Sequence, residues 1–313
     1  MKKAFIFPGQ GSQKVGMVKD LYDKYDSVKA IIRDADETLG FSISGMMFEG
    51  PDTELMKTEF TQPAILTASV ACWQVLRENG ISAEAAAGHS LGEYSALVAA
   101  GAIPFSDAVH TVHLRGRFMQ EAVPLGEGGM AAVIGLDPEK IVEICGKVSE
   151  TEGAVQAVNF NCPGQTVIAG ATKAVETACG ELKAAGAKRA LMLKVSAPFH
   201  STLMEPAALR LKEVLDKITI RDAEIPVYAN FNAKAETKAD EIRENLIMQA
   251  AHAVHWEESV RRMIADGFDT YVEVGPGTVL SGFMRKIDKT QTSMHAEDIQ
   301  TIEDTVKALK GEE

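Results

Sequence analysis

The residues best suited to chemistry form a G-x-S-x-G pattern around Ser90, with Gly88 and Gly92 on either side. A serine that attacks a carbonyl must stand clear of the backbone, and a sharp, strained strand-to-helix turn presents it in this way. Glycines suit that turn because larger side chains would collide with the adjoining strand and helix. The following helix would direct N–H groups and its positive dipole end at a developing oxyanion. The pattern predicts a nucleophile at Ser90, and the alternative is a tight turn that happens to contain serine.

A serine nucleophile needs a base, and imidazole is the usual partner. Of the seven histidines, His89 adjoins the serine, so its side chain should point away from the hydroxyl. His200 follows the serine in chain order and lies in a loop, where Pro198 keeps the preceding backbone out of helix. We therefore take His200 as the candidate base, with a structural histidine as the alternative. The sequence shows no obvious third member, so either a carboxylate or a backbone carbonyl would orient the imidazole.

An arginine on an apolar helix face is the third candidate. Within a helix expected over residues 106–122, Arg115 shares a face with apolar residues by i+3 and i+4 spacing: Ala108, Val112 and Met119. An unpaired buried charge is costly, so the guanidinium must reach water or a carboxylate. The sequence alone favours a salt bridge to a protein Asp or Glu. The other interpretation is a clamp for a substrate carboxylate, which suits a planar guanidinium.

A glycine-rich turn follows the first predicted strand, residues 2–7. Gly9 and Gly11 fit the start of a dinucleotide fingerprint, but Lys14 occupies the third glycine position, and no G-K-[ST] phosphate loop follows. The glycines either let the backbone approach a ligand closely, with Gln10 presenting an N–H or amide, or form a plain strand-to-loop turn.

Composition and charge exclude several classes of protein. The net charge of −12 argues against nucleic acid and anionic membranes as partners. We expect no signal peptide and no transmembrane span, because no apolar run is long enough. The four cysteines lie far apart without a C-x-x-C pair, which fits reduced thiols in a cytoplasmic protein and predicts no metal site: Cys72, Cys145, Cys162 and Cys179.

The order of elements predicts an α/β fold with an inserted subdomain. Strands are expected at 130–136, 155–159, 166–169 and 188–195, and helices at 138–151 and 173–185. That order, β-α-β-β-α-β, is the ferredoxin-like unit. We assign residues 127–196 to this subdomain. Residues 1–126 and 197–313 would form one discontinuous, α/β-hydrolase-like catalytic domain around a parallel sheet.

With these features in place, the chain resembles the malonyl-CoA:acyl-carrier-protein transacylases of bacterial type II fatty acid synthesis. The matching stretches follow the family's order: FPGQGSQ (7–13), TQPA (61–64), GHSLGEYSALVAAG (88–101), LRGRFMQEAVP (114–124), NFNCPGQTVIAG (159–170), APFHS (197–201) and EVGPG (273–277). Together they span nearly the whole chain. GHSLGEY alone would also fit acyltransferase domains of polyketide synthases.

The resemblance implies a role for each catalytic residue. Ser90 would be the nucleophile and His200 the base. A main-chain carbonyl would orient the imidazole, and its position maps to Gln249. The backbone N–H groups of Gln10 and Leu91 would form the oxyanion hole.

The resemblance also implies a substrate pocket. Arg115 would hold the free carboxylate of the malonyl group, against the salt bridge that the sequence alone favours. Gln62 would line the pocket. Phe199 stands just before the histidine, and a phenylalanine there in this family implies a preference for malonyl over methylmalonyl. One departure concerns the loop after Gln249, where the family often shows P-V-[RK]-[WF] and this chain has AVHW at 253–256.

The activity implied is ping-pong transfer of malonyl from malonyl-CoA to the phosphopantetheine thiol of acyl carrier protein, through a malonyl-serine. No metal or redox cofactor is implied, and we expect a monomer. A serine esterase or thioesterase would use the same nucleophile and base. A carrier-docking module with a dead site is a non-enzymatic alternative, against which the intact Ser90, His200 and Arg115 argue.

Carrier proteins of this pathway are acidic by resemblance, yet this chain is acidic too. We therefore predict a local basic patch near the cleft, with five candidates: Lys188, Arg189, Lys194, Arg285 and Lys286. The alternative is that these are ordinary solvated cations.

Overall fold

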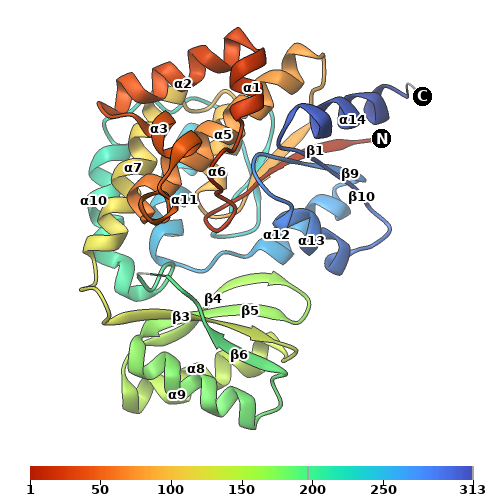
Figure 1. The fold of residues 1–313 in the computed structure, drawn as a ribbon. Coiled ribbons are helices and arrows are strands. Elements are labelled where there is room, and N and C mark those ends of the chain that lie inside the picture. The colour runs from red at the N-terminus through yellow and green to blue at the C-terminus, as the bar shows by residue number, and fades with distance from the viewer. Residues whose placement is uncertain (196, 312–313) are drawn as a thin grey trace.

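Two separate sheets organise the chain in the computed structural model, which describes residues 1–195 and 197–311 (Figure 1). The larger sheet has the order β10-β9-β1-β2-β7-β8. Its strands are β1 (Lys3–Phe7), β2 (Ala85–Gly88), β7 (Val227–Tyr228), β8 (Ala235–Glu236), β9 (Thr270–Val274) and β10 (Thr292–Ala296). All neighbours pair in parallel except β8, which runs antiparallel to β7. The carboxyl ends of β1 and β2 therefore meet at one edge, where open α/β sheets place their ligands.

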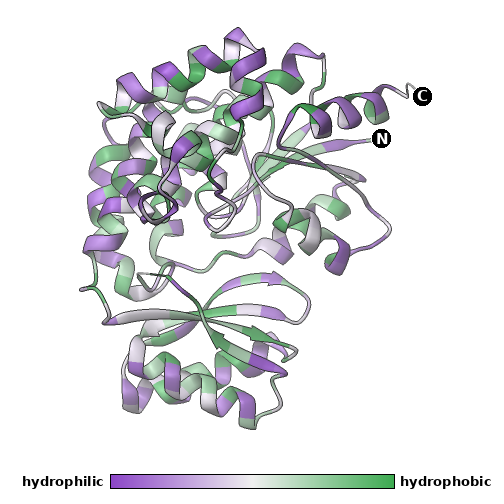
Figure 2. Cartoon of the chain, viewed as in Figure 1, coloured by the Kyte–Doolittle hydropathy of each residue, from purple (hydrophilic) through white to green (hydrophobic). Residues whose placement is uncertain are grey.

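Helices cover both faces of the larger sheet (Figure 1). They are α1 (Lys19–Lys24), α2 (Asp26–Leu39), α3 (Ile43–Glu49), α4 (Asp52–Leu55), α5 (Thr58–Glu78), α6 (Gly92–Ala99), α7 (Phe105–Glu121), α10 (Glu205–Leu215), α11 (Ala239–Ala251), α12 (Trp256–Ala265), α13 (Val279–Ile287) and α14 (Ile299–Lys310). A short 3₁₀ turn, Thr202–Met204, precedes α10. Peripheral helices such as α2 alternate hydrophilic and hydrophobic residues, as amphipathic helices do (Figure 2).

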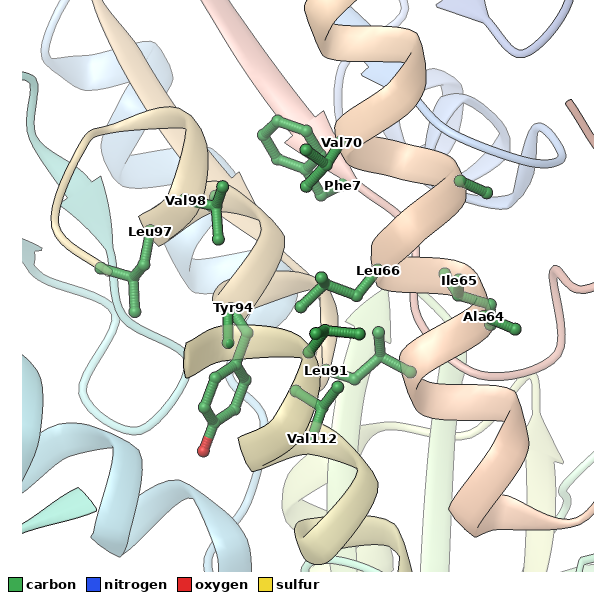
Figure 3. Packing of buried hydrophobic residues seen from close by; sticks show 14 of the residues in the cluster. Phe7, Ala64, Ile65, Leu66, Val70, Leu91, Tyr94, Leu97, Val98 and Val112 are labelled. Carbon is green, nitrogen blue, oxygen red and sulfur yellow. The ribbon is translucent and has the colours of Figure 1, made fainter. Parts of the chain in front are cut away.

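The core of the large domain forms around α5, which is apolar on nearly every side and buried along most of its length. Leu66 of α5 packs near Val112 of α7 and near Leu91 and Tyr94, which open α6 (Figure 3). A helix buried on all faces cannot move without disturbing its neighbours, because interiors are close-packed. This packing gives a rigid support to α6, which begins two residues after Ser90, and to α7, which carries Arg115 in its interior.

The smaller sheet has the order β4-β5-β3-β6, with every neighbouring pair antiparallel. Its elements are β3 (Gly128–Ile134), α8 (Pro138–Glu152), β4 (Val155–Cys162), β5 (Gln165–Ala171), α9 (Thr172–Ala184) and β6 (Arg189–Met192). In the unit's own numbering the strand order is 2-3-1-4, which is the ferredoxin-like arrangement, so the predicted fold class is confirmed. The domain boundaries stay a prediction, and Ser196, at one of them, lies outside the described residues.

The two sheets are joined through the loop that follows α11. The N–H of Phe160 in β4 donates to the carbonyl of Val254 at 2.9 Å, and the N–H of Val254 donates to the carbonyl of Val158 at 2.8 Å. The Phe160 ring stacks on His255, with centroids 5.4 Å apart. The AVHW departure at 253–256 is therefore the segment that docks the small domain.

Several elements differ in extent from the expectation. The sequence predicts one charged helix over residues 18–39, and the structure divides it into α1 and α2, because Tyr25 adopts an extended backbone with φ −112° and ψ 122°. The strand expected at 188–195 is shorter, Arg189–Met192, and α3 and α4 were not predicted. Within the described residues, no helix has the length and apolar character needed to cross a membrane.

Candidate active site

Ser90 lies in the turn between β2 and α6, with a left-handed φ of 53° that is rare outside glycine. The flanking glycines are required by close packing. A Cβ on Gly88 would lie 1.9 Å from the carbonyl carbon of Gly92, and a Cβ on Gly92 would lie 2.2 Å from the carbonyl oxygen of Phe7. The structure therefore has the strained strand–turn–helix geometry that the G-x-S-x-G pattern predicts.

The imidazole of His200 bridges the serine and a main-chain carbonyl. Its Nε2 lies 2.7 Å from Ser90 Oγ, and its Nδ1 lies 2.8 Å from the carbonyl oxygen of Gln249. A carbonyl can only accept, so Nδ1 carries the proton and Nε2 is free to take one from the hydroxyl. The AVHW loop leaves this contact in place, so the geometry expected at Gln249 is present.

The surroundings keep this imidazole neutral. Burial lowers the pKa of His200 to about 3, and the positive charge of Arg115 acts in the same direction. A neutral imidazole is the form that can act as a base. The loop that carries His200 is itself strained, with a φ of 62° at this residue.

Arg115 is buried at the floor of the site and has polar partners instead of charged ones. Its Nη1 donates to Oε1 of Gln62 at 2.8 Å, and its Nη2 donates to Oε1 of Gln249 at 2.9 Å and to Ser90 Oγ at 3.2 Å. No carboxylate forms an ion pair with Arg115 in the part of the chain that the structure describes. The salt bridge favoured by the sequence alone is thus not found there, and the buried cation faces the nucleophile.

A pocket of about 130 Å³ opens beside Ser90. Its polar wall comprises Gln10, Gln62, His89, Arg115, Asn159 and His200, and its apolar wall comprises Leu91, Met119, Met130, Leu193, Val195 and Phe199. A cavity of about 150 Å³ can hold a molecule the size of benzene, so a small acyl group fits this space.

The N–H groups predicted for an oxyanion hole lie at this pocket. Gln10 lies in the loop after β1, and Leu91 lies just before α6. In the loop after β1, a Cβ added to Gly9 would lie 2.6 Å from the carbonyl oxygen of His89. The two loops therefore touch backbone to backbone. Neither Gln10 nor Leu91 donates its N–H to another described residue, and both residues line the pocket.

One residue that the sequence analysis did not identify, Asn230, holds the turn in place. Asn230 accepts the Ser90 N–H at its Oδ1 (2.7 Å) and donates from Nδ2 to the Gly88 carbonyl (2.7 Å). Its signal was present, because it follows a strand at the sheet edge where ligands bind. His89, as expected, points elsewhere: its Nε2 lies 2.8 Å from Asn161 Oδ1 of the small domain.

The predicted basic patch consists of exposed residues from both domains. Lys188, Arg189 and Lys194 lie in or beside β6, and Arg285 and Lys286 lie in the last turn of α13. Lys194 sits between Leu193 and Val195, which line the pocket. Lys286 Nζ donates to Gln165 Oε1 at 3.2 Å. Among the described residues none of the five has a carboxylate partner, and whether they act as a patch stays a prediction.

The four cysteines are buried and free of disulfides, as expected. Among residues 1–195 and 197–311, no group of three or more His, Cys, Asp or Glu side chains is placed to hold a metal ion.

Comparison with known proteins places the whole chain in one family. Residues 4–306 match the family model described as acyl transferase domain. A malonyl CoA-acyl carrier protein transacylase of Bacillus subtilis is 50% identical over 311 residues, covering 99% of this chain and 98% of that protein. The Escherichia coli K12 protein of the same name is 51% identical over 291 residues, covering 93% and 94%.

Solved structures agree with this placement. An acyl carrier protein S-malonyltransferase from Vibrio cholerae superposes with a TM-score of 0.95 at 45% identity, covering 97% of this chain and all of that one. A malonyl-transacylase in complex with its type II PKS acyl-carrier protein gives 0.95 at 44% identity, covering 99% and 100%.

Proposed function

The chain belongs to the malonyl CoA-acyl carrier protein transacylases, and we propose that it transfers malonyl from malonyl-CoA to the phosphopantetheine thiol of an acyl carrier protein for fatty acid synthesis. One observation carries the substrate assignment. Arg115 is a buried cation that forms no ion pair with a carboxylate among the described residues, although the buried Glu93 acts on it electrostatically, and its Nη2 lies 3.2 Å from Ser90 Oγ. A guanidinium placed there selects an acyl group that bears its own carboxylate.

In the first half-reaction the malonyl carboxylate binds Arg115 and the thioester carbonyl lies over Ser90. His200 Nε2 takes the hydroxyl proton as Oγ attacks the carbonyl carbon. The N–H groups of Gln10 and Leu91 receive the developing oxyanion, and the loss of one such donor costs on the order of a hundredfold in rate. As the intermediate collapses, the C–S bond breaks, the imidazolium returns its proton to the sulfur, and CoA leaves.

The second half-reaction reverses these roles with a new thiol. His200 takes the proton of the phosphopantetheine thiol, and the sulfur attacks the malonyl-serine carbonyl. Collapse of the second tetrahedral intermediate breaks the ester C–O bond, and the proton on the imidazolium returns to Ser90 Oγ. The two substrates supply every atom, so the proposed cycle uses no further cofactor. We place this cycle in the cytoplasm and in a monomer.

The remaining pocket residues tune which acyl group fits. Gln62 Oε1 holds one guanidinium nitrogen of Arg115 at 2.8 Å, so it sets the direction of the clamp. Phe199 lies on the apolar wall of the pocket. A branch at the malonyl α-carbon would press against that wall, which supports a preference for malonyl over methylmalonyl.

The proposal is tested by the intact mass of the protein after mixing with malonyl-CoA. Wild type should gain one malonyl group and Ser90→Ala should gain none. Holo acyl carrier protein should then discharge the adduct much faster than buffer does. An adduct that decays to water at the same rate with or without the carrier would identify a serine hydrolase. Absence of any adduct would refute a covalent mechanism and support a docking role.

A further inference from the structure

Glu93, in the first turn of α6, is fully buried beneath the active site, and the mechanism above does not use it. One of its oxygens, Oε2, accepts two hydrogen bonds, from the main-chain N–H of Asn230 at 2.8 Å and from Nε2 of Gln249 at 3.1 Å. Its other oxygen, Oε1, has no hydrogen-bond partner among the described residues. Burying a carboxyl group with only one hydrogen-bonded oxygen costs folding free energy, so we look for a role that requires this glutamate.

One of the two partners of Glu93, Gln249, contacts three parts of the proposed catalytic machinery. Its main-chain carbonyl holds His200 Nδ1, its Oε1 accepts from Arg115 Nη2, and its Nε2 donates to the Ser90 carbonyl at 2.9 Å. An amide can rotate by half a turn, and only its neighbours decide which way it points. With Glu93 accepting from Nε2, the amide oxygen faces the guanidinium. In the reverse orientation, the amide oxygen of Gln249 would face Oε2 of Glu93, and its NH₂ group would face the donors of Arg115.

The second partner, Asn230, holds the nucleophile turn. Glu93 anchors its backbone, and its side chain then bonds the Ser90 N–H and the Gly88 carbonyl, both at 2.7 Å. Asn230 and Gln249 come from separate segments, after β7 and within α11. One oxygen therefore joins these two segments to α6.

We infer that Glu93 is a positioning residue, whose Oε2 sets Asn230 and Gln249 and, through them, the Ser90 turn, the His200 imidazole and the Arg115 clamp. Its role is to accept hydrogen bonds at a defined point. Burial raises the pKa of Glu93, and the hydrogen bonds from Asn230 and Gln249 and the charge of Arg115 oppose that rise. Oε2 can accept both in the carboxylate and in the neutral form whose proton is on Oε1. The kinetic test of this inference rests on the proposed function, because it measures malonylation of Ser90.

The test separates side-chain length from charge. In Glu93→Gln the amide oxygen can occupy the place of Oε2, so this variant should retain at least about a third of the wild-type rate of serine malonylation. Glu93→Ala removes the acceptor. Glu93→Asp keeps the carboxyl group but shortens the side chain by one methylene, so the oxygen no longer reaches Asn230 and Gln249. Both should slow malonylation about a hundredfold, the effect of a misplacement near 1 Å at a reacting group. Single-turnover quenching with intact-mass detection measures the rate.

Glu273 supplies the matched control. It is also fully buried and accepts two main-chain N–H groups, from Leu280 at 3.0 Å and Ser281 at 2.7 Å, away from the site. Glu273→Ala and Glu93→Ala should both lower Tm, but folded Glu273→Ala should malonylate within about threefold of the wild-type rate. A loss of rate in both variants to the same degree would mean that Glu93 is merely structural.

A spectroscopic readout is independent of turnover. The Nδ1–H proton of His200, bonded to the Gln249 carbonyl, should give one downfield ¹H resonance in wild type and Glu93→Gln, and should shift or vanish in Glu93→Asp. Wild-type rates in folded Glu93→Asp, or a Glu93→Gln variant as slow as Glu93→Asp, would overturn the inference. If wild type itself forms no malonyl-serine, the proposed function fails, and the resonance still decides the role of Glu93.

Discussion

Arg115 Nη2 donates to Ser90 Oγ at 3.2 Å, so the residue that we propose as the carboxylate clamp is in direct contact with the residue that we propose as the nucleophile. The remaining guanidinium contacts are to the neutral amide oxygens of Gln62 and Gln249. A malonyl carboxylate can therefore replace uncharged acceptors with a charged one, which forms stronger hydrogen bonds. Burial, and after it the charge of the same guanidinium, lower the pKa of His200. Binding of the acid would weaken that effect and make the base stronger when it is needed.

Replacement of Arg115 by alanine should change acyl selectivity more than it changes the chemical step. Hydrogen bonds to a charged group contribute about 1.5 to 3 kcal/mol, so kcat/KM for malonyl-CoA should fall roughly tenfold to a hundredfold. Loading of acetyl-CoA should stay constant or rise. Steady-state rates with both thioesters measure this. Arg117 on the same helix is the control, because it is exposed and pairs with Glu121 at 2.9 Å, and Arg117→Ala should leave both rates unchanged. Equal losses for both thioesters would contradict the clamp.

The pH dependence of serine malonylation should lack an acid limb near the ordinary histidine pKa of about 6.5. Burial lowers the pKa of His200 to about 3, so the neutral, basic form persists as the pH falls. We expect kcat/KM for the first half-reaction to stay level from about pH 8 to about pH 5. Stopped single turnovers across this range measure it, with protein fold checked by circular dichroism. A tenfold loss between pH 7 and pH 5.5 in folded protein would show that the imidazole titrates normally.

The glycines of the nucleophile turn should tolerate no side chain. In Gly92→Ala the new Cβ would lie 2.2 Å from the Phe7 carbonyl oxygen, so β1 and α6 must separate. We expect a loss of about 3 kcal/mol or more in the free energy of unfolding, and no malonyl adduct. Gly146, in the middle of α8, has open space around its Cβ position, and Gly146→Ala should stabilise by about 0.5 to 1 kcal/mol. Urea unfolding compares the two, and an active, stable Gly92→Ala would refute the packing argument.

Charge reversal in the basic patch should weaken carrier use and leave CoA use intact. The double variant Lys194→Glu, Arg285→Glu should raise the apparent KM for acyl carrier protein roughly tenfold, and the effect should shrink with added salt. The KM for malonyl-CoA should hold within about twofold if the patch contacts the carrier alone. Lys307→Glu, an exposed cation without an ion-pair partner in the described chain, controls for net charge. Similar effects on both substrates would show that the patch serves the cleft in general.

Much of the fold could be predicted from local patterns. The insert was predicted from its β-α-β-β-α-β order of elements, and its strand order follows from the ferredoxin-like unit. The helices α3 and α4 were missed because they are short, and their apolar residues, such as Ile43 and Leu55, make no complete helical stripe. The break at Tyr25 was missed because it depends on the backbone angle of one residue within a charged helical run.

The site could be predicted as far as single residues carry chemistry. The turn around Ser90 and a loop histidine at His200 follow from spacing, but the partners of a buried group depend on tertiary packing. The sequence favoured an acid for Arg115, whereas the structure offers two glutamines from α5 and α11. Glu93 was read only as part of a motif, because a glutamate in the first helical turn is ordinarily a surface residue that favours the helix dipole.

The order of strands in the larger sheet also governs how the chain can fold while it is synthesised. β1 lies between β2 and β9, so Ile6 pairs with Glu273, which is made long after it. At about 5 to 20 residues per second, a ribosome takes roughly tens of seconds to cover that separation. Throughout that time an apolar central strand has one open edge, the kind of surface that aggregates. The small domain, contiguous in sequence, can complete its own sheet within the same interval. The nascent protein can thus complete the domain that walls one side of the pocket before the sheet that carries Ser90.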